Sequence, residues 1–293
     1  MTPAPVESSG YRSGPHPAES RARKLLRLSM FLFTAIVACP IRYWPLGSHD
    51  DDTWVFAINY ARANGFVLGR DIFWTTGPLG YMVFPQDMGS NLIHGLVFQA
   101  LLWCGLIGVF WDLFFRSGLR LRNLTLFVFL FALSAPLYWF NYMGAENLLL
   151  AAVLILLVVF QVRGGFLRFI AALLFAGVIP LIKFTGGMIV AGALAGFLAQ
   201  RLVRYGRAAL REVACAAVIP TAVTLAGSLS VMPPSAFSTY LKASMEVTRG
   251  YSEAMSLAGP RIELFAAALT LLGIGGLLVW RAGSGSARSG SAR

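Results

Sequence analysis

Three consecutive aspartates, Asp50, Asp51 and Asp52, are the residues of this chain best suited to do chemistry. They follow an apolar run that is long enough to cross a membrane. A carboxylate at the centre of a membrane helix costs about 2.5–3.5 kcal/mol, so three together are expected at a membrane edge or in a site. Because adjacent carboxylates repel one another, at least one should have a raised pKa, which suits it to act as a general base toward a hydroxyl group.

Two other interpretations of this acidic cluster remain open. Asp52 is a natural N-cap for a helix over residues 53–64, which explains one aspartate but not three. Asp51 and Asp52 could instead hold a divalent metal, because hard cations prefer oxygen ligands. No other cofactor is indicated.

Four further charged residues lie between the apolar runs. Arg62 and Arg70 could balance the charge of the acidic cluster, and Asp50 and Arg70 are candidates for binding substrate. Glu146 lies in a short loop, where a simple span boundary explains it equally well. Lys183 joins two apolar runs, and such a lysine usually extends its ammonium group to the membrane surface. Near carboxylates it could instead hold a phosphate.

The composition is that of a membrane protein. Hydrophobic residues make up 57% of the 293 residues and charged residues only 13%, with a mean hydropathy of +0.68. A soluble protein would carry about 25% charged residues. The net charge of +11 does not indicate nucleic-acid binding, because the basic residues lie in short clusters between apolar runs and not on one soluble face.

The apolar runs predict an all-α fold, a polytopic bundle of about eight membrane-spanning helices. Their expected ranges are about 25–45, 91–115, 121–140, 147–162, 166–182, 184–200, 211–232 and 262–280. Residues 1–24 are rich in Pro, Ser and Gly, and residues 282–293 repeat Gly, Ser, Ala and Arg. We therefore expect a disordered cytoplasmic tail over 1–24, a transmembrane domain over 25–281 and a low-complexity tail over 282–293.

The distribution of charge orients these helices. With the N-terminus inside, alternation puts most of the 24 basic residues on the inner side and most of the 13 acidic residues on the outer side. Both ends of the chain are then cytoplasmic, and the acidic cluster lies in an outer loop over residues 47–90. Within that loop, residues 53–64 combine apolar and aromatic side chains with few charges, which predicts a helix that lies along the membrane surface.

Four short motifs stand out in this loop: Asp51-Asp52-Thr53-Trp54, Tyr60-Ala61, Gly69-Arg70-Asp71 and Gly77-Pro78-Leu79. Together they resemble the GT-C-type membrane glycosyltransferases, relatives of protein O-mannosyltransferases and of the aminoarabinose transferases that modify lipid A. The resemblance covers about residues 28–200 and implies sugar transfer from a polyprenyl-phosphate donor on the extracytoplasmic side. It implies Asp51 as the base with Asp52 beside it, Glu146 as a second acidic position, and Lys183 facing the donor phosphate.

The expected function is therefore an inverting sugar transfer in a bacterial inner membrane. Its partners would be the lipid-linked donor and membrane lipid, and the sequence does not indicate an oligomeric state. The alternatives are a non-catalytic membrane subunit or transporter of envelope-polysaccharide assembly, and an inactive fragment, since such enzymes usually have more spans. A transporter should carry ionisable residues in mid-span, whereas nearly all charges here lie at span ends.

Overall fold

The computed structural model describes residues 21–45, 53–73, 76–140 and 145–255, together with Phe265 and Leu269. The chain divides into two compact units, residues 1–244 and 245–293. In the described residues of both units the regular elements are helices, and the first unit adds two isolated β-bridges. The prediction of an all-α protein is confirmed for this part of the chain.

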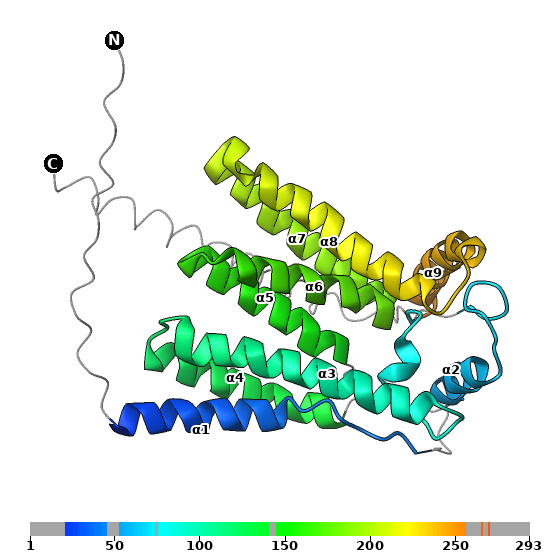
Figure 1. Ribbon diagram of the computed structural model, residues 1–293, viewed down its shortest axis with the longest axis horizontal. Coiled ribbons are helices and arrows are strands. Elements are labelled where there is room, and N and C mark those ends of the chain that lie inside the picture. The colour runs from blue at the N-terminus through cyan, green and yellow to red at the C-terminus, as the bar shows by residue number, and fades with distance from the viewer. Residues whose placement is uncertain are drawn as a thin grey trace, which may run out of the picture. The chain divides into compact units, whose positions relative to one another are not determined.

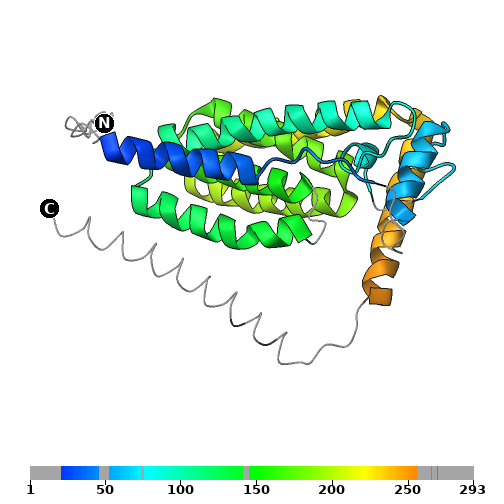
Figure 2. The same cartoon turned by 90° about the horizontal axis from the view of Figure 1, so that it is seen from below.

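Seven long helices of the first unit run roughly along one direction, and a short helix lies across one end of them (Figures 1 and 2). The long helices are α1 (Arg21–Val37), α3 (Asn91–Trp111), α4 (Leu121–Phe140), α5 (Ala145–Arg163), α6 (Phe166–Ile182), α7 (Phe184–Tyr205) and α8 (Leu210–Leu229). The short crosswise helix is α2 (Thr53–Ala63). The last helix, α9 (Pro234–Met255), begins in the first unit and ends in the second.

Three helical stretches in the described residues are long and apolar enough to cross a membrane: Asn91–Arg116, Ala145–Arg163 and Phe184–Leu229. The third of these contains α7 and α8, joined by a short 3-10 turn, η4 (Gly206–Ala209). The apolar helices Leu121–Leu133 and Phe166–Ile182 are shorter. These stretches support a membrane protein, whereas the count of eight spans stays a prediction. Most of the predicted span over 262–280 lies outside the described residues.

The structure differs from the predicted helix ranges most at two places. The first span was expected over about residues 25–45, but α1 begins at Arg21 and ends at Val37. Pro40 and Pro45 lack the N–H group that a continuing helix needs, so residues 38–45 are not helical. The apolar runs predict no helix between 232 and 262, but α9 occupies residues Pro234–Met255 of this segment. That helix is amphipathic and carries many polar residues, so a search for apolar runs does not find it.

The core of the bundle lies where α3, α5 and α6 pack together. Its largest fully buried apolar side chains include Leu106, Phe114, Leu149, Phe169, Leu173 and Ile179. In a membrane such packing stabilises the bundle by close van der Waals contact, because lipid tails are as apolar as leucine.

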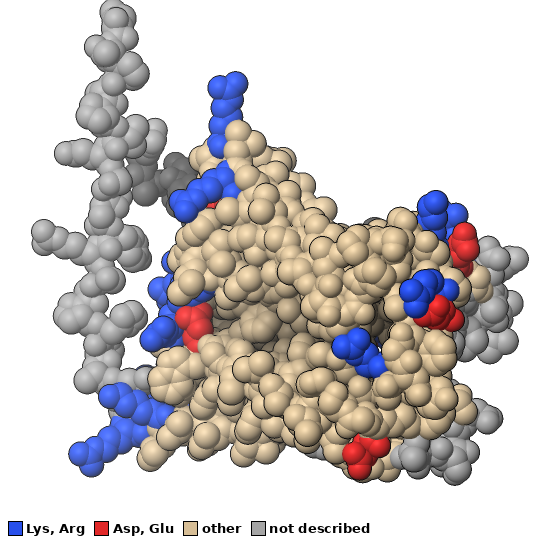
Figure 3. All heavy atoms as spheres, turned by 45° about the vertical axis from the view of Figure 1, so that its right-hand side comes forward, with Lys and Arg blue, Asp and Glu red and all other residues tan. Residues whose placement is uncertain are grey.

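Basic side chains gather at one end of the bundle, which we call the basic end (Figure 3). They include Arg27 of α1, Arg168 of α6 and Arg201 of α7. Arg168 binds Asp112 through two hydrogen bonds of 2.7 and 2.8 Å, and Arg201 binds Glu212 in the same bidentate manner. Arg163 donates to the carbonyl oxygen of Ser117 at 2.7 Å. These contacts join the helix ends and leave a strong excess of positive charge there.

Candidate functional site

The opposite end of the bundle, which we call the loop end, is organised by a turn at residues 76–79. The N–H of Gly77 donates to the carbonyl of Ile182 at 2.8 Å, and the N–H of Leu79 donates to the carbonyl of Leu181 at 2.7 Å. Thr76 also pairs with Lys183 in an antiparallel β-bridge. Helix α6 ends here because Lys183 is extended, with φ −148° and ψ 121°. The turn therefore satisfies carbonyl groups that the end of α6 leaves free.

Gly77 is required for this contact. A Cβ atom added at this position would collide with the backbone carbonyl groups of Pro180 and Leu181. No other residue allows the two backbones to approach so closely. The Gly77-Pro78-Leu79 motif is thus explained by its packing against the end of α6.

Lys183 and Glu146 form an ion pair beside this turn. The distance from Lys183 Nζ to Glu146 Oε1 is 3.3 Å, and the lysine side chain is 48% exposed whereas the carboxylate is 9% exposed. The other carboxylate oxygen, Oε2, is buried and has no hydrogen-bond partner in the described part of the chain. The pair thus joins an accessible cation to a carboxylate that still has a free acceptor.

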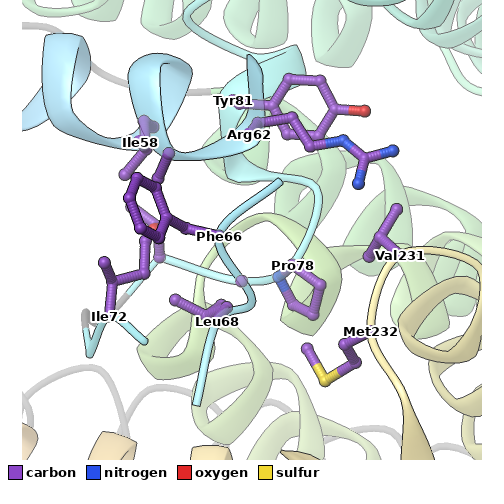
Figure 4. Close-up of a pocket in the computed structure, with 12 residues that line it drawn as sticks. Ile58, Arg62, Phe66, Leu68, Ile72, Pro78, Tyr81, Val231 and Met232 are labelled. Carbon is purple, nitrogen blue, oxygen red and sulfur yellow. The ribbon is translucent and has the colours of Figure 1, made fainter. Parts of the chain in front are cut away.

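A small cavity of about 40 Å³ lies beside the same turn (Figure 4). We call it the slot. It is lined by Ile58, Ala61, Arg62, Phe66, Leu68, Ile72, Thr76, Gly77, Pro78, Tyr81, Val231 and Met232. The guanidinium group of Arg62 lies 5.6 Å from the centre of the Tyr81 ring, and Figure 4 shows the two side chains next to each other. The slot is therefore lined mostly by apolar side chains, with one cation at its edge.

Asn59 fixes α2 in place. This residue was not among those predicted from the sequence. Its side chain is fully buried and donates to the carbonyl of Phe84 at 2.8 Å, and its Oδ1 accepts from the N–H of Gln86 at 3.2 Å. Asn91 donates to the carbonyl of Asn59 at 2.8 Å. An asparagine on the apolar face of a predicted helix is the signal that could have revealed this role, because a buried amide needs partners.

Gln99 has a similar role on α3. It accepts a hydrogen bond from the N–H of Arg42 at 2.7 Å and donates to the carbonyl of Val83 at 3.0 Å. The segment after α1 and the segment before α3 are therefore joined through one buried amide side chain.

The structure brings together two of the predicted site residues, Glu146 and Lys183. Arg70 binds its neighbour Asp71 at 2.9 Å and does not contact that pair. Hydrogen bonds from the Arg70 guanidinium and from the N–H of Val67 hold the pKa of Asp71 below its ordinary value. The predicted catalytic residues, Asp51 and Asp52, and the neighbouring Asp50 lie outside the described residues.

A metal site is not found in the part of the chain that the structure describes: no group of three or more His, Cys, Asp and Glu residues gathers there. The metal alternative depends on the acidic cluster, so it stays a prediction.

Comparisons of the chain with models of known protein families, with curated proteins and with solved structures find no match. The arrangement at the loop end is therefore interpreted from its own chemistry.

Proposed function

We propose that this protein is a membrane glycosyltransferase of the GT-C type, which transfers a sugar from a polyprenyl-phosphate donor to an extracytoplasmic acceptor. One observation carries the proposal: the Gly77 turn, Lys183 and Glu146, from three distant parts of the chain, meet at the loop end. One of the motifs that resemble this enzyme class, Gly77-Pro78-Leu79, forms part of this meeting point.

Lys183 is suited to bind the donor phosphate. Its ammonium group has three donors, of which the pair with Glu146 uses one. Because the side chain is half-exposed, the others can reach a phosphate at the membrane surface. A cation fixed next to the leaving phosphate lowers the free energy of the charge that develops there.

Glu146 is suited to bind the sugar. The buried oxygen Oε2 lacks a partner in the described residues, and an unsatisfied buried acceptor costs about 1–3 kcal/mol. A rotation of the carboxylate that exposes this oxygen would let a sugar hydroxyl donate to it and remove that cost. Glu146 would then orient both Lys183 and the sugar.

The chemical step is an inverting displacement with Asp51 as the base, a role that rests on the sequence alone. The carboxylate takes the proton of the acceptor hydroxyl, and the acceptor oxygen attacks the anomeric carbon. The bond between that carbon and the phosphate oxygen breaks, and polyprenyl phosphate leaves. Asp52 supports the base, while Asp50 and Arg70 contact substrate. A divalent metal held by Asp51 and Asp52 is the alternative to Lys183 for balancing the phosphate charge.

The positive-inside rule supports the orientation that this reaction needs. The basic end of the bundle faces the cytoplasm under that rule, and the loop end then faces the extracytoplasmic side of a bacterial inner membrane. The donor site, the acidic cluster and the slot are all assigned to that side.

Binding of farnesyl phosphate, a short polyprenyl phosphate, to the detergent-solubilised protein tests the donor site. We expect saturable binding that Lys183→Ala weakens about tenfold or more and that Lys183→Arg retains. Lys242→Ala, which removes an exposed lysine of α9, should leave the affinity unchanged. Asp51→Asn should bind the probe and fail to transfer sugar. Binding no stronger than that of an unrelated membrane protein would overturn the proposal and favour a non-catalytic subunit.

A further inference from the structure

We infer that the slot and Arg62 form a second ligand site, for an amphiphile that carries an anionic group next to a small apolar group. That such a ligand binds is inferred from the slot and Arg62 alone. Its assignment as the acceptor of the sugar rests on the proposed function.

The cation of this site has no carboxylate partner in the described part of the chain. Arg168 and Arg201 bind Asp112 and Glu212, whereas the described partner of Arg62 is the ring of Tyr81. Ring contact leaves the N–H groups at the edge of the guanidinium plane free to donate. A guanidinium presents these donors as a planar fork that fits a phosphate or a carboxylate. Arg62 is also exposed, so an anion can reach it without rearrangement of α2.

The walls of the slot select the rest of the ligand. Apart from Arg62 and Thr76, its lining consists of apolar or aromatic side chains and one glycine. Figure 4 shows Phe66, Leu68, Ile72 and Pro78 gathered around the space below Arg62. A space of about 40 Å³ admits only a few atoms. A small alkyl group enters it, and the remainder of the ligand stays outside.

The position of the slot suits a second substrate. Thr76 and Gly77 line it, and the same two residues pair with Lys183 and Ile182. One short segment therefore contacts both the proposed donor site and the slot. Transfer between two bound molecules requires such neighbouring sites, because holding both reactants replaces an encounter in solution.

Calorimetric titration of the full-length protein with butyl phosphate tests the inference. Arg62→Gln should weaken binding about tenfold or more, since it removes a charge-assisted contact. Arg62→Lys, which keeps the charge, should weaken it less. Arg116→Gln removes an exposed arginine at the basic end and should leave the affinity unchanged. The same comparison in Lys183→Ala protein removes any contribution of the donor site. An affinity that Arg62→Gln does not change would overturn the inference.

Two further arms test the apolar part and the source of the ligand. Glycerol phosphate should bind several-fold more weakly than butyl phosphate, and Ala61→Val, which fills the slot, should abolish that difference. Equal affinities for the two phosphates in the unmodified protein would show that the slot does not bind the apolar group of the ligand.

If short-chain phosphatidate binds more tightly than butyl phosphate, the ligand is a lipid; if it binds less tightly, the ligand is a soluble amphiphile. Loss of Arg62-dependent binding leaves the farnesyl phosphate test of Lys183 unaffected, so failures of the two proposals are distinguishable.

Discussion

Lys183 Nζ lies 3.3 Å from Glu146 Oε1, although α5 and α6 separate the two residues in the sequence. Glu146 is in the first turn of α5, and Lys183 lies between α6 and α7. Because α5 and α6 are antiparallel, the start of one helix lies beside the end of the other. The contact thus depends on the hairpin as a whole.

A double-mutant cycle measures the energy of this pair. Lys183→Met leaves the Glu146 carboxylate buried without its cation and should lower the free energy of unfolding by about 1–3 kcal/mol. Glu146→Gln should cost less, since the exposed lysine remains solvated. The coupling energy should be about 0.5–1 kcal/mol, because the lysine is half-exposed. Equilibrium unfolding in mixed micelles gives these values, and strictly additive effects would show that the pair does not contribute.

Gly77→Ala should disrupt the loop end. The new Cβ collides with carbonyl groups at the end of α6, so the turn must move and lose its hydrogen bonds to Leu181 and Ile182. We expect a loss of about 1–3 kcal/mol in the free energy of unfolding and weaker farnesyl phosphate binding. Gly196→Ala is the matched control, because a Cβ at that position of α7 meets open space. Equal behaviour of the two variants would contradict the close contact.

Asn59→Ala should release α2 from the bundle. The carbonyl of Phe84 and the N–H of Gln86 lose their side-chain partner, which costs about 2 kcal/mol or more. Hydrogen exchange of the α2 amides should rise in parallel. Asn64→Ala is the control. Both side chains donate to the carbonyl four residues earlier, Asn59 to Val55 and Asn64 to Tyr60, but Asn64 is exposed, so its loss should change stability by less than about 0.5 kcal/mol. If both variants unfold alike, the buried network is not what holds α2.

Because Tyr240 is buried, we expect the folded protein to become less stable at alkaline pH. The first part of α9 packs this side chain between Gly69 and Phe184, and burial raises its pKa from 10.0 to about 12. The unfolded chain releases the phenol proton near pH 10 while the folded protein retains it. Stability is therefore complete below pH 10 and decreases as the pH rises toward 12, by about 3 kcal/mol at most.

The measurement for Tyr240 is equilibrium unfolding from pH 8 to 12. Tyr240→Phe should show a smaller decrease over pH 10–12 than the unmodified protein. Tyr60→Phe, which removes an exposed hydroxyl group, should keep the full decrease. Identical curves for the two variants would mean that Tyr240 is not the group responsible.

Most helices could be predicted from the sequence, because membrane-length apolar runs are a local signal. The predicted ranges 121–140 and 166–182 coincide with α4 and α6, and 147–162 differs from α5 by two residues or fewer at each end. The helix over 53–64 also formed, as α2. α9 was missed because an amphipathic helix lacks an apolar run, and the end of α1 was misplaced because its boundary depends on prolines inside such a run.

The candidate site divides in the same way. Sequence alone singled out Lys183, Glu146 and the Gly77-Pro78-Leu79 turn, since charges and turn residues stand out between apolar runs. It could not show that the turn packs on the end of α6, that Lys183 pairs with Glu146, or that Arg62 lies at the edge of an apolar slot. Those contacts join residues from different helices, and side-chain and backbone packing between helices decides them. What is local in the chain was determined by its residues, and what brings distant residues together was decided only by the tertiary structure.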